Sequence, residues 1–219
     1  NELLIFVTKG KVNALVGKDR RVAGPGMFVA IPPNVRHSVK ATEDGDCAYL
    51  YIKDRTWTLV GVGAEETLPD RPLTIEESAQ LAARDGGNSE NKARPGQSPM
   101  IVEGVPHCFY QLADAIDAPV GCAIRKEWFE GQRLGFGFFE FPYASTLESN
   151  ASEAEQFVYV CSGLINADVG NDHRQMKPGD IAEISKGMPY ALTSEQGEPA
   201  RFVMVRSLPF LENKIDQAA

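Results

Sequence analysis

Three histidines, at positions 37, 107 and 173, are the side chains of this 219-residue chain best suited to acid–base work or metal binding near neutral pH. No Ser-His-Asp order and no nucleophile elbow accompany them, so acyl-transfer chemistry is not expected. His173 stands in a predicted hairpin turn, where we expect it to be exposed. His107 follows a Val-Pro pair between two β-rich segments, and we expect it to pack there. His37 is therefore the histidine with a candidate role.

Four cysteines, at positions 47, 108, 122 and 161, could in principle bind metal or form disulfides. They contain no CxxC pair and no regular spacing, so we expect free thiols that are mostly buried. The formal net charge of −8 argues against a nucleic-acid partner, because phosphate binding needs a concentrated basic surface. No run of 18 apolar residues exists, so the sequence predicts no membrane-spanning helix.

The elements that position these residues come from an internal repeat. A shift of 153 positions aligns residues 2–41 with 155–194 without a gap. The identities fall at turn glycines, such as Gly10 with Gly163, and at the Pro-Gly pairs that begin at Pro25 and Pro178. Backbone geometry restricts the residue type at such places. The repeat therefore predicts two copies of one small fold.

Each copy is predicted to contain short strands separated by tight turns, which is typical of a β-sandwich or β-barrel. Two more strands are expected near 120–128 and 133–141. The capping box at residues 74–77 predicts a helix over Ile75–Arg84, and a second short helix is expected over Cys108–Ile116. The polar stretch 85–99 is predicted to be a loop. The expected strands of the two copies are 3–8, 11–16, 27–31, 37–41 and 47–53, and 156–161, 164–169, 180–184, 190–194 and 200–206.

Both copies resemble the cupin superfamily. The tail of the first cupin motif corresponds to residues 2–10 and 155–163, and a loose second motif corresponds to 24–37 and 177–190. The resemblance implies an all-β-dominated fold of two cupin-type antiparallel β-barrels (jelly rolls) with a short helical insert. The expected organisation is an N-terminal barrel at 1–55 that lacks its upstream strands, an insert at 56–119, a C-terminal barrel at 120–210 and a tail at 211–219.

In the C-terminal copy, the positions where metal-binding cupins carry His and Glu ligands correspond to Asn150, Ser152, Gln156 and Tyr190. This set has no imidazole, so no metal is expected in this barrel. Tyr190 and Gln156 are the candidate catalytic residues. Asn150, Ser152 and Arg125 are the candidate substrate-binding residues.

In the N-terminal copy, His37 occupies the second-motif ligand position, and Leu3 replaces the first-motif carboxylate, with Glu2 beside it. Neighbouring residues of a strand face opposite sides, so Glu2 and Leu3 cannot both point inward without a bulge. One hypothesis is that His37 binds one divalent metal (Fe, Mn, Ni, Cu or Zn), with Glu2 or with two histidines located before Asn1. The alternative is that His37 is hydrogen-bonded inside an inert barrel.

Three functions remain open, because the cupin fold hosts many activities. The leading hypothesis is a metal-dependent, dioxygenase-like oxidoreductase that acts on a small organic molecule in the N-terminal barrel. The second is a metal-free isomerase, lyase or cyclase that uses the C-terminal barrel, with Glu153 or Glu155 as further proton-transfer groups. The third is a non-catalytic binding or scaffold protein. We also expect a cytoplasmic location, unless a signal peptide precedes Asn1, and a homodimer that covers outward-facing apolar residues.

Overall fold

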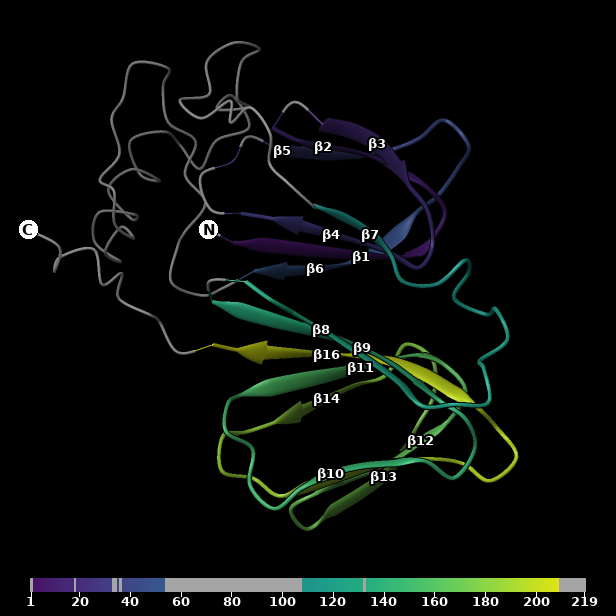
Figure 1. The fold of residues 1–219 in the computed structure, drawn as a ribbon, viewed down its shortest axis with the longest axis vertical. Helices are drawn as coiled ribbons and strands as arrows, with labels where there is room; N and C mark the ends of the chain where they lie inside the picture. The colour runs from purple at the N-terminus through teal and green to yellow at the C-terminus, as the bar shows by residue number, and fades with distance from the viewer. Residues whose placement is uncertain are drawn as a thin grey trace, which may run out of the picture. The chain divides into compact units, whose positions relative to one another are not determined.

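The computed structural model describes residues 2–17, 19–32, 35, 37–53, 108–131 and 133–208. The chain divides into two compact units, Asn1–Tyr110 and Gln111–Ala219. Every regular element in the described residues is a β-strand (Figure 1). None of those residues forms a helix long and apolar enough to cross a membrane. The all-β fold class is therefore confirmed.

The N-terminal unit consists of two antiparallel sheets, which form two layers in Figure 1. One sheet has the order β6-β1-β4-β7 and the other β3-β2-β5. Leu3, Ile5, Val12 and Val29 belong to the apolar core between them. The strands are β1 (Leu3–Lys9), β2 (Val12–Val16), β3 (Asp19–Ala23), β4 (Met27–Ile31), β5 (His37–Ala41), β6 (Ala48–Lys53) and β7 (Phe109–Gln111).

The C-terminal unit has the same two-layer design with more strands. Its sheets have the orders β14-β11-β16-β9-β8 and β10-β15-β12-β13. The core contains the aromatic residues Phe139, Phe141 and Phe202, with Phe139 and Phe202 stacked at 4.9 Å between ring centroids. The strands are β8 (Arg125–Glu130), β9 (Leu134–Phe141), β10 (Thr146–Ser149), β11 (Gln156–Ser162), β12 (Ile165–Val169), β13 (Asp172–Met176), β14 (Ile181–Ile184), β15 (Tyr190–Ser194) and β16 (Ala200–Ser207).

The predicted repeat is confirmed down to its irregularities. Strand β1 has a register shift between Val7 and Lys9 against β6, and β11 has the equivalent shift between Val160 and Ser162 against β16. The Pro-Gly turns also match, because the N–H of Gly26 and that of Gly179 each donate to the equivalent strand carbonyl at 2.9 Å. The two units therefore share one backbone plan, and their differences lie mainly in side chains.

The helix predicted over Cys108–Ile116 is wrong. Residues 109–111 form strand β7 at the edge of a sheet, and the N–H of Ala30 donates to the carbonyl of Cys108 at 2.8 Å. A short apolar run fits either a helix or a strand, and here pairing with β4 decides the outcome. The helix predicted over Ile75–Arg84 and the loop predicted at 85–99 lie outside the described residues.

A row of charged side chains crosses the sheet on β8, β9 and β16. Arg201 is 1% exposed, and its Nε donates to Glu140 Oε1 at 2.9 Å. The same guanidinium donates to three backbone carbonyls in segment 115–118. Arg125 donates to Glu140 Oε2 at 3.3 Å and to the carbonyl of Leu112 at 2.6 Å. This row attaches the segment that leads into β8 to the outer face of the sheet.

All four cysteines are free, and Cys108 and Cys161 are buried, Cys47 is half-buried and Cys122 is exposed. Burial raises the pKa of the Cys161 thiol to about 12, so this thiol stays protonated at neutral pH.

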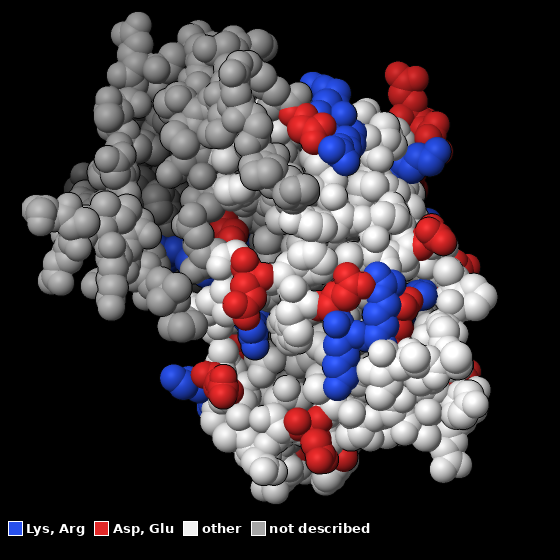
Figure 2. Space-filling model, viewed as in Figure 1, with Lys and Arg blue, Asp and Glu red and all other residues white. Residues whose placement is uncertain are grey.

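Acidic and basic side chains lie beside one another on the face drawn in Figure 2. The ion pairs of the described residues include Lys11–Asp44, at 3.2 Å. The apolar residues expected to cover a dimer interface differ in exposure, since Phe6 is buried whereas Phe157 is 38% exposed. The homodimer stays a prediction.

Gly163 offers a test of the turn that both repeats share. Its φ is +72°, and a Cβ there would lie 2.2 Å from the carbonyl oxygen of Pro199. We expect Gly163→Ala to lower the free energy of unfolding by about 3 kcal/mol, measured by urea denaturation, since strain and a backbone clash combine. Gly179 has φ +94° with open space around it, so Gly179→Ala should lose only about 1 kcal/mol. Equal losses in the two variants would contradict the close-approach argument.

Candidate functional site

A cavity of about 620 Å³ opens at one end of the C-terminal barrel, where β11 and β15 begin and where β8, β10 and β16 end. Both sheets contribute inward-facing side chains to its wall, and the loop at 152–154 forms part of its rim. The residues that matter for its chemistry are Lys126, Trp128, Glu130, Ser152, Glu153, Gln156, Tyr190 and Arg206.

Strand register explains why Gln156 and Arg206 meet. Gln156 lies opposite Arg206 across β11 and β16, and Arg206 lies opposite Gly135 across β16 and β9. Directly opposed residues of an antiparallel pair project to the same face of the sheet. A Cβ at position 135 would stand 2.8 Å from Cγ of Arg206, so glycine is what lets the arginine lie flat over β9.

A chain of hydrogen bonds holds the polar wall of the cavity. Gln156 Nε2 donates to Ser152 Oγ at 2.5 Å, and Ser152 Oγ donates to the carbonyl of Ala154. The side chain of Gln156 is also hydrogen-bonded to the phenol of Tyr190. Because Gln156 and Ser152 are buried and satisfied, they hold Tyr190 in one orientation.

Burial raises the pKa of Tyr190 above the usual value of 10.0, while its hydrogen bond with Gln156 and the positive charge of Arg206 act in the opposite direction. The net effect is upward. The phenol is therefore protonated at neutral pH and can donate a hydrogen bond or a proton to a bound molecule.

Arg206 places a cation in the same wall. Its guanidinium lies 4.3 Å from the centre of the Trp128 ring, and its Nη2 pairs with Glu130. Its Nε is buried and has no hydrogen-bond partner within the part of the chain that the structure describes. An unsatisfied buried donor is unusual. The Arg206 side chain as a whole is 30% exposed and lines the cavity, so its positive charge can act on a bound molecule.

The structure brings together Gln156, Ser152 and Tyr190, three of the residues predicted from sequence. The other two predicted residues of this barrel do not line the cavity. Asn150 is exposed after β10, and Arg125 bonds with Glu127, Glu140 and the carbonyl of Leu112 instead.

The sequence did not predict Lys126 and Trp128 as site residues. The two β8 residues alternate along that strand, and this spacing indicates one face of a sheet. The shift of 153 positions does align Lys53 with Arg206, so the repeat marks a cation here in both copies, although it does not show that Arg206 meets Gln156.

His37 begins β5, where it is half-buried opposite Val16, as Tyr190 lies opposite Val169 in the other barrel. Its Nδ1 is 2.9 Å from the carbonyl oxygen of Val35. A carbonyl only accepts, so the proton belongs on Nδ1, and Nε2 is left as an acceptor or metal ligand.

The donors described around His37 do not complete a metal site. Leu3 stands where the other barrel has Gln156, and it belongs to the apolar core. Glu2 is buried, but its place next to Leu3 turns it toward the opposite face of the strand. Among the described residues no group of three or more His, Cys, Asp or Glu could hold a metal ion. His107 lies outside these residues, and His173 is exposed and paired with Asp168 at 2.6 Å.

The amide, hydroxyl and phenol groups of the C-terminal cavity do not fit a transition metal either. Such ions select imidazole, thiolate or carboxylate ligands, and the amide nitrogen of Gln156 already donates to Ser152.

Comparison with known families finds a match to the family described as Cupin domain, at residues 1–53 and 137–206. These two ranges fall one in each unit and together cover more than half of the chain. A sequence comparison with curated proteins finds no match.

Several solved structures share the fold across both units at low identity. AerE from Microcystis aeruginosa is 9% identical with a TM-score of 0.57, covering 95% of this chain and 78% of its own. A cupin 2 conserved barrel domain protein from Leptotrichia buccalis is 12% identical with a TM-score of 0.57, covering 95% and 74%. Oxalate decarboxylase from Bacillus subtilis, described with Mn(II) centres, is 14% identical with a TM-score of 0.57, covering 94% and 63%. This chain thus spans less than two thirds of that enzyme.

The environment of Tyr190 predicts a high ionisation midpoint. With tyrosine carrying a ¹³C label at Cζ, NMR titration of the folded protein should show Tyr190 deprotonating above pH 10, because burial disfavours the phenolate. Above pH 10, Tyr190 therefore keeps its proton in the folded state after it has lost it in the unfolded chain. Below pH 10 this group does not change the free energy of unfolding, and above pH 10 it should make that free energy fall as the pH rises. Tyr190→Phe identifies the resonance, and a midpoint below 10 would contradict the buried phenol.

Proposed function

This chain belongs to the cupin family, and we propose that its C-terminal barrel binds a small oxygen-bearing organic molecule and moves a proton on it without a metal. The observation that carries the proposal is a protonated Tyr190 phenol, hydrogen-bonded to Gln156, in one cavity with Arg206. The amide and hydroxyl ligand set of this barrel also favours hydrogen bonding over metal coordination.

The cavity suits a metabolite-sized molecule. Its volume of about 620 Å³ lies in the range of small-molecule sites. Trp128 and Phe139 offer aromatic surface at one side, with their rings edge to face at 5.6 Å between centroids. Tyr190 offers a hydrogen-bond donor, and the Arg206 guanidinium offers a positive charge, to the oxygens of the ligand.

The proposed reaction is proton transfer at a carbon next to a carbonyl group, as an isomerase or lyase requires. Glu153 lines the cavity and takes the proton from carbon as the general base. The electron pair of the broken C–H bond moves toward the carbonyl oxygen, and Tyr190 donates its proton to that oxygen. Arg206 stabilises the negative charge that develops there, and Gln156 keeps the phenol oriented.

Exchange of substrate hydrogen with solvent tests this proposal. We expect the wild-type protein, in D₂O with a panel of small 2-oxo and 3-oxo acids, to speed deuterium incorporation next to a carbonyl, followed by ¹H NMR. Tyr190→Phe should lower the rate about 100-fold, because it removes the general acid.

Tyr143→Phe is the matched control, since this tyrosine is 66% exposed and does not line the cavity. Its rate should equal that of the wild type. Binding of a panel member without exchange would support the non-catalytic hypothesis, and an unchanged rate in Tyr190→Phe would overturn the assigned role of the phenol.

A metal-dependent oxidoreductase, dioxygenase-like and centred on His37, is the second candidate. The supporting observation is the hydrogen bond from Nδ1 to the carbonyl of Val35, since metal-bound histidines usually donate their other ring N–H in this way. Among the described residues, this site has one imidazole and no neighbouring carboxylate ligand.

Metal content separates the two candidates. If His37 is a ligand, elemental mass spectrometry should find close to one equivalent of Fe, Mn, Ni, Cu or Zn in the purified wild type. His37→Ala should then lose it, whereas His173→Ala should keep it, because His173 is exposed in a hairpin. Equal metal content in the wild type and both variants would show that His37 is not a metal ligand.

A further inference from the structure

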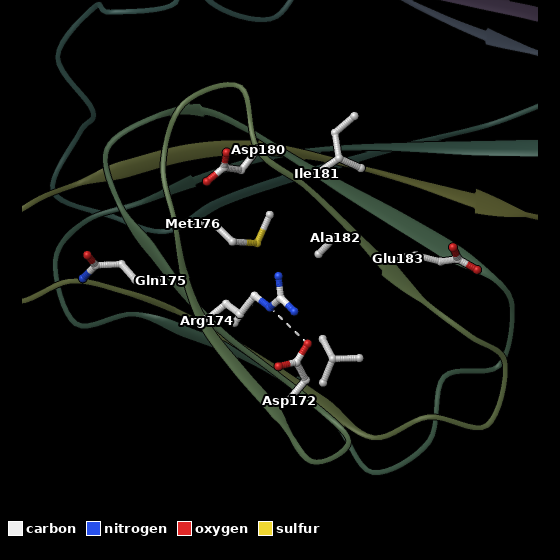
Figure 3. A pocket seen from close by; sticks show the side chains of 10 residues that line it. Asp172, Arg174, Gln175, Met176, Asp180, Ile181, Ala182 and Glu183 are labelled. Carbon is white, nitrogen blue, oxygen red and sulfur yellow. Dashed lines mark hydrogen bonds and ion pairs between the residues drawn. The ribbon is translucent and has the colours of Figure 1, made fainter.

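A second cavity, of about 640 Å³, lies between β13 and β14 of the C-terminal barrel, separate from the residues of the first. Its apolar lining includes Val169, Met176 and Ala182, and Figure 3 shows Met176 and Ala182 close to the space between the two strands. Asp172 and Arg174 pair on the β13 side at 3.1 Å. We call this cavity the β13–β14 groove.

The internal repeat gives this groove a counterpart in the N-terminal barrel, between β3 and β4. The shift of 153 positions places Val16, Asp19, Arg21 and Val29 where the groove has Val169, Asp172, Arg174 and Ala182. The ion pair is conserved between the copies, because Arg21 pairs with Asp19 at 3.0 Å.

The N-terminal counterpart is filled by the segment around β7. Cys108 is buried in the same apolar cluster as Val16 and Val29. The Phe109 ring lies under the guanidinium of Arg21, 4.9 Å from the ring centre. The segment 108–111 thus lies along the edge of β4, with Cys108 packed in the apolar cluster and the Phe109 ring on the guanidinium of Arg21.

The equivalent edge in the C-terminal barrel has no such strand in the part of the chain that the structure describes, because β14 ends its sheet. Ile181 on this strand is 64% exposed. The N–H of Ala30 on β4 points away from β1 and donates to the carbonyl of Cys108. Glu183 is the equivalent residue of β14 and has the equivalent pairing with β11, so its N–H points to the open edge. Open strand edges are sites where an extended segment can pair.

We propose that the β13–β14 groove binds an extended segment of a partner polypeptide, which adds a strand to β14 as β7 adds to β4. The segment pairs with the backbone of Glu183, buries a small side chain against Val169 and Ala182, and places an aromatic ring on Arg174.

The charged residues of the groove indicate the charge of the partner segment. The carboxylates Asp180 and Glu183 stand where the N-terminal barrel has the uncharged Met27 and Ala30. With Asp172, three carboxylates and one arginine line the β13–β14 groove. The carboxylate of Asp180 accepts a hydrogen bond from the backbone of Lys177 at 2.9 Å, whereas Glu183 is exposed on the edge strand itself, where an added strand would lie beside it. The partner segment therefore carries a lysine or arginine beside its small and aromatic residues.

Fluorescence anisotropy with a labelled peptide tests the proposal on the full chain. The probe is the peptide Gly-Lys-Ala-Phe-Tyr-Gln, which keeps the small-aromatic pattern of Cys108–Gln111 and adds a lysine. We expect saturable binding that weakens as salt rises. Replacing Phe by Ala in the probe should weaken binding at least tenfold.

Two variants of one residue separate pairing from charge. Glu183→Pro removes the outward N–H and should abolish binding, while the fold should persist because an edge strand tolerates proline where its N–H faces outward. Glu183→Gln keeps the N–H and should weaken binding severalfold with a smaller salt dependence. Lys186→Ala, in the turn after β14, should bind as the wild type does, and circular dichroism checks that each variant is folded.

Equal binding by wild type and Glu183→Pro would overturn the proposal, as would the absence of binding at millimolar peptide. A dimer that Glu183→Pro dissociates, detected by light scattering without peptide binding, would also overturn it, because a second copy of this chain would then occupy the edge.

Discussion

The C-terminal unit depends on a charge that cannot reach water. Arg201 is 1% exposed, and a guanidinium so placed is tolerated only with a counter-ion and a full set of acceptors. Glu140 supplies the counter-ion, and the carbonyls of segment 115–118 accept most of the remaining N–H groups. Meeting this requirement fixes three things together: the register of β9 against β16, the path of the chain into β8, and the side of the sheet that faces the cavity.

The side of the sheet that faces the cavity is set by the charged residues on its outer face. Arg125 and Glu140 are opposed on β8 and β9 and point outward, so their neighbours Lys126 and Phe139 point inward. The same alternation on β16 turns Arg206 toward Gln156. The candidate site is therefore built by strand geometry and not by a flexible loop alone. A site on paired strands holds its groups more precisely than one on loops.

Much of the fold could be predicted because turn residues have few substitutes. Gly10, Gly163 and the Pro-Gly pairs fixed the repeat, and with it the strands and the positions of Gln156 and Tyr190. The segment at 108–111 could not be predicted, since four residues carry too little periodicity to separate strand from helix and only the partner strand decides. The position of Arg206 beside Gln156 could not be predicted either, because it follows from a register across three strands and from the absence of a side chain at Gly135.

The matching register shifts in β1 and β11 bear on the history of the chain. A bulge interrupts a ladder of hydrogen bonds, and an independent origin would have little reason to set it at the same residue twice. Both halves thus descend from one ancestral barrel that already carried this irregularity. After duplication, the two copies diverged in the side chains at the open end of the barrel while the backbone stayed the same. The N-terminal copy has Leu3 and His37 where the C-terminal copy has Gln156 and Tyr190.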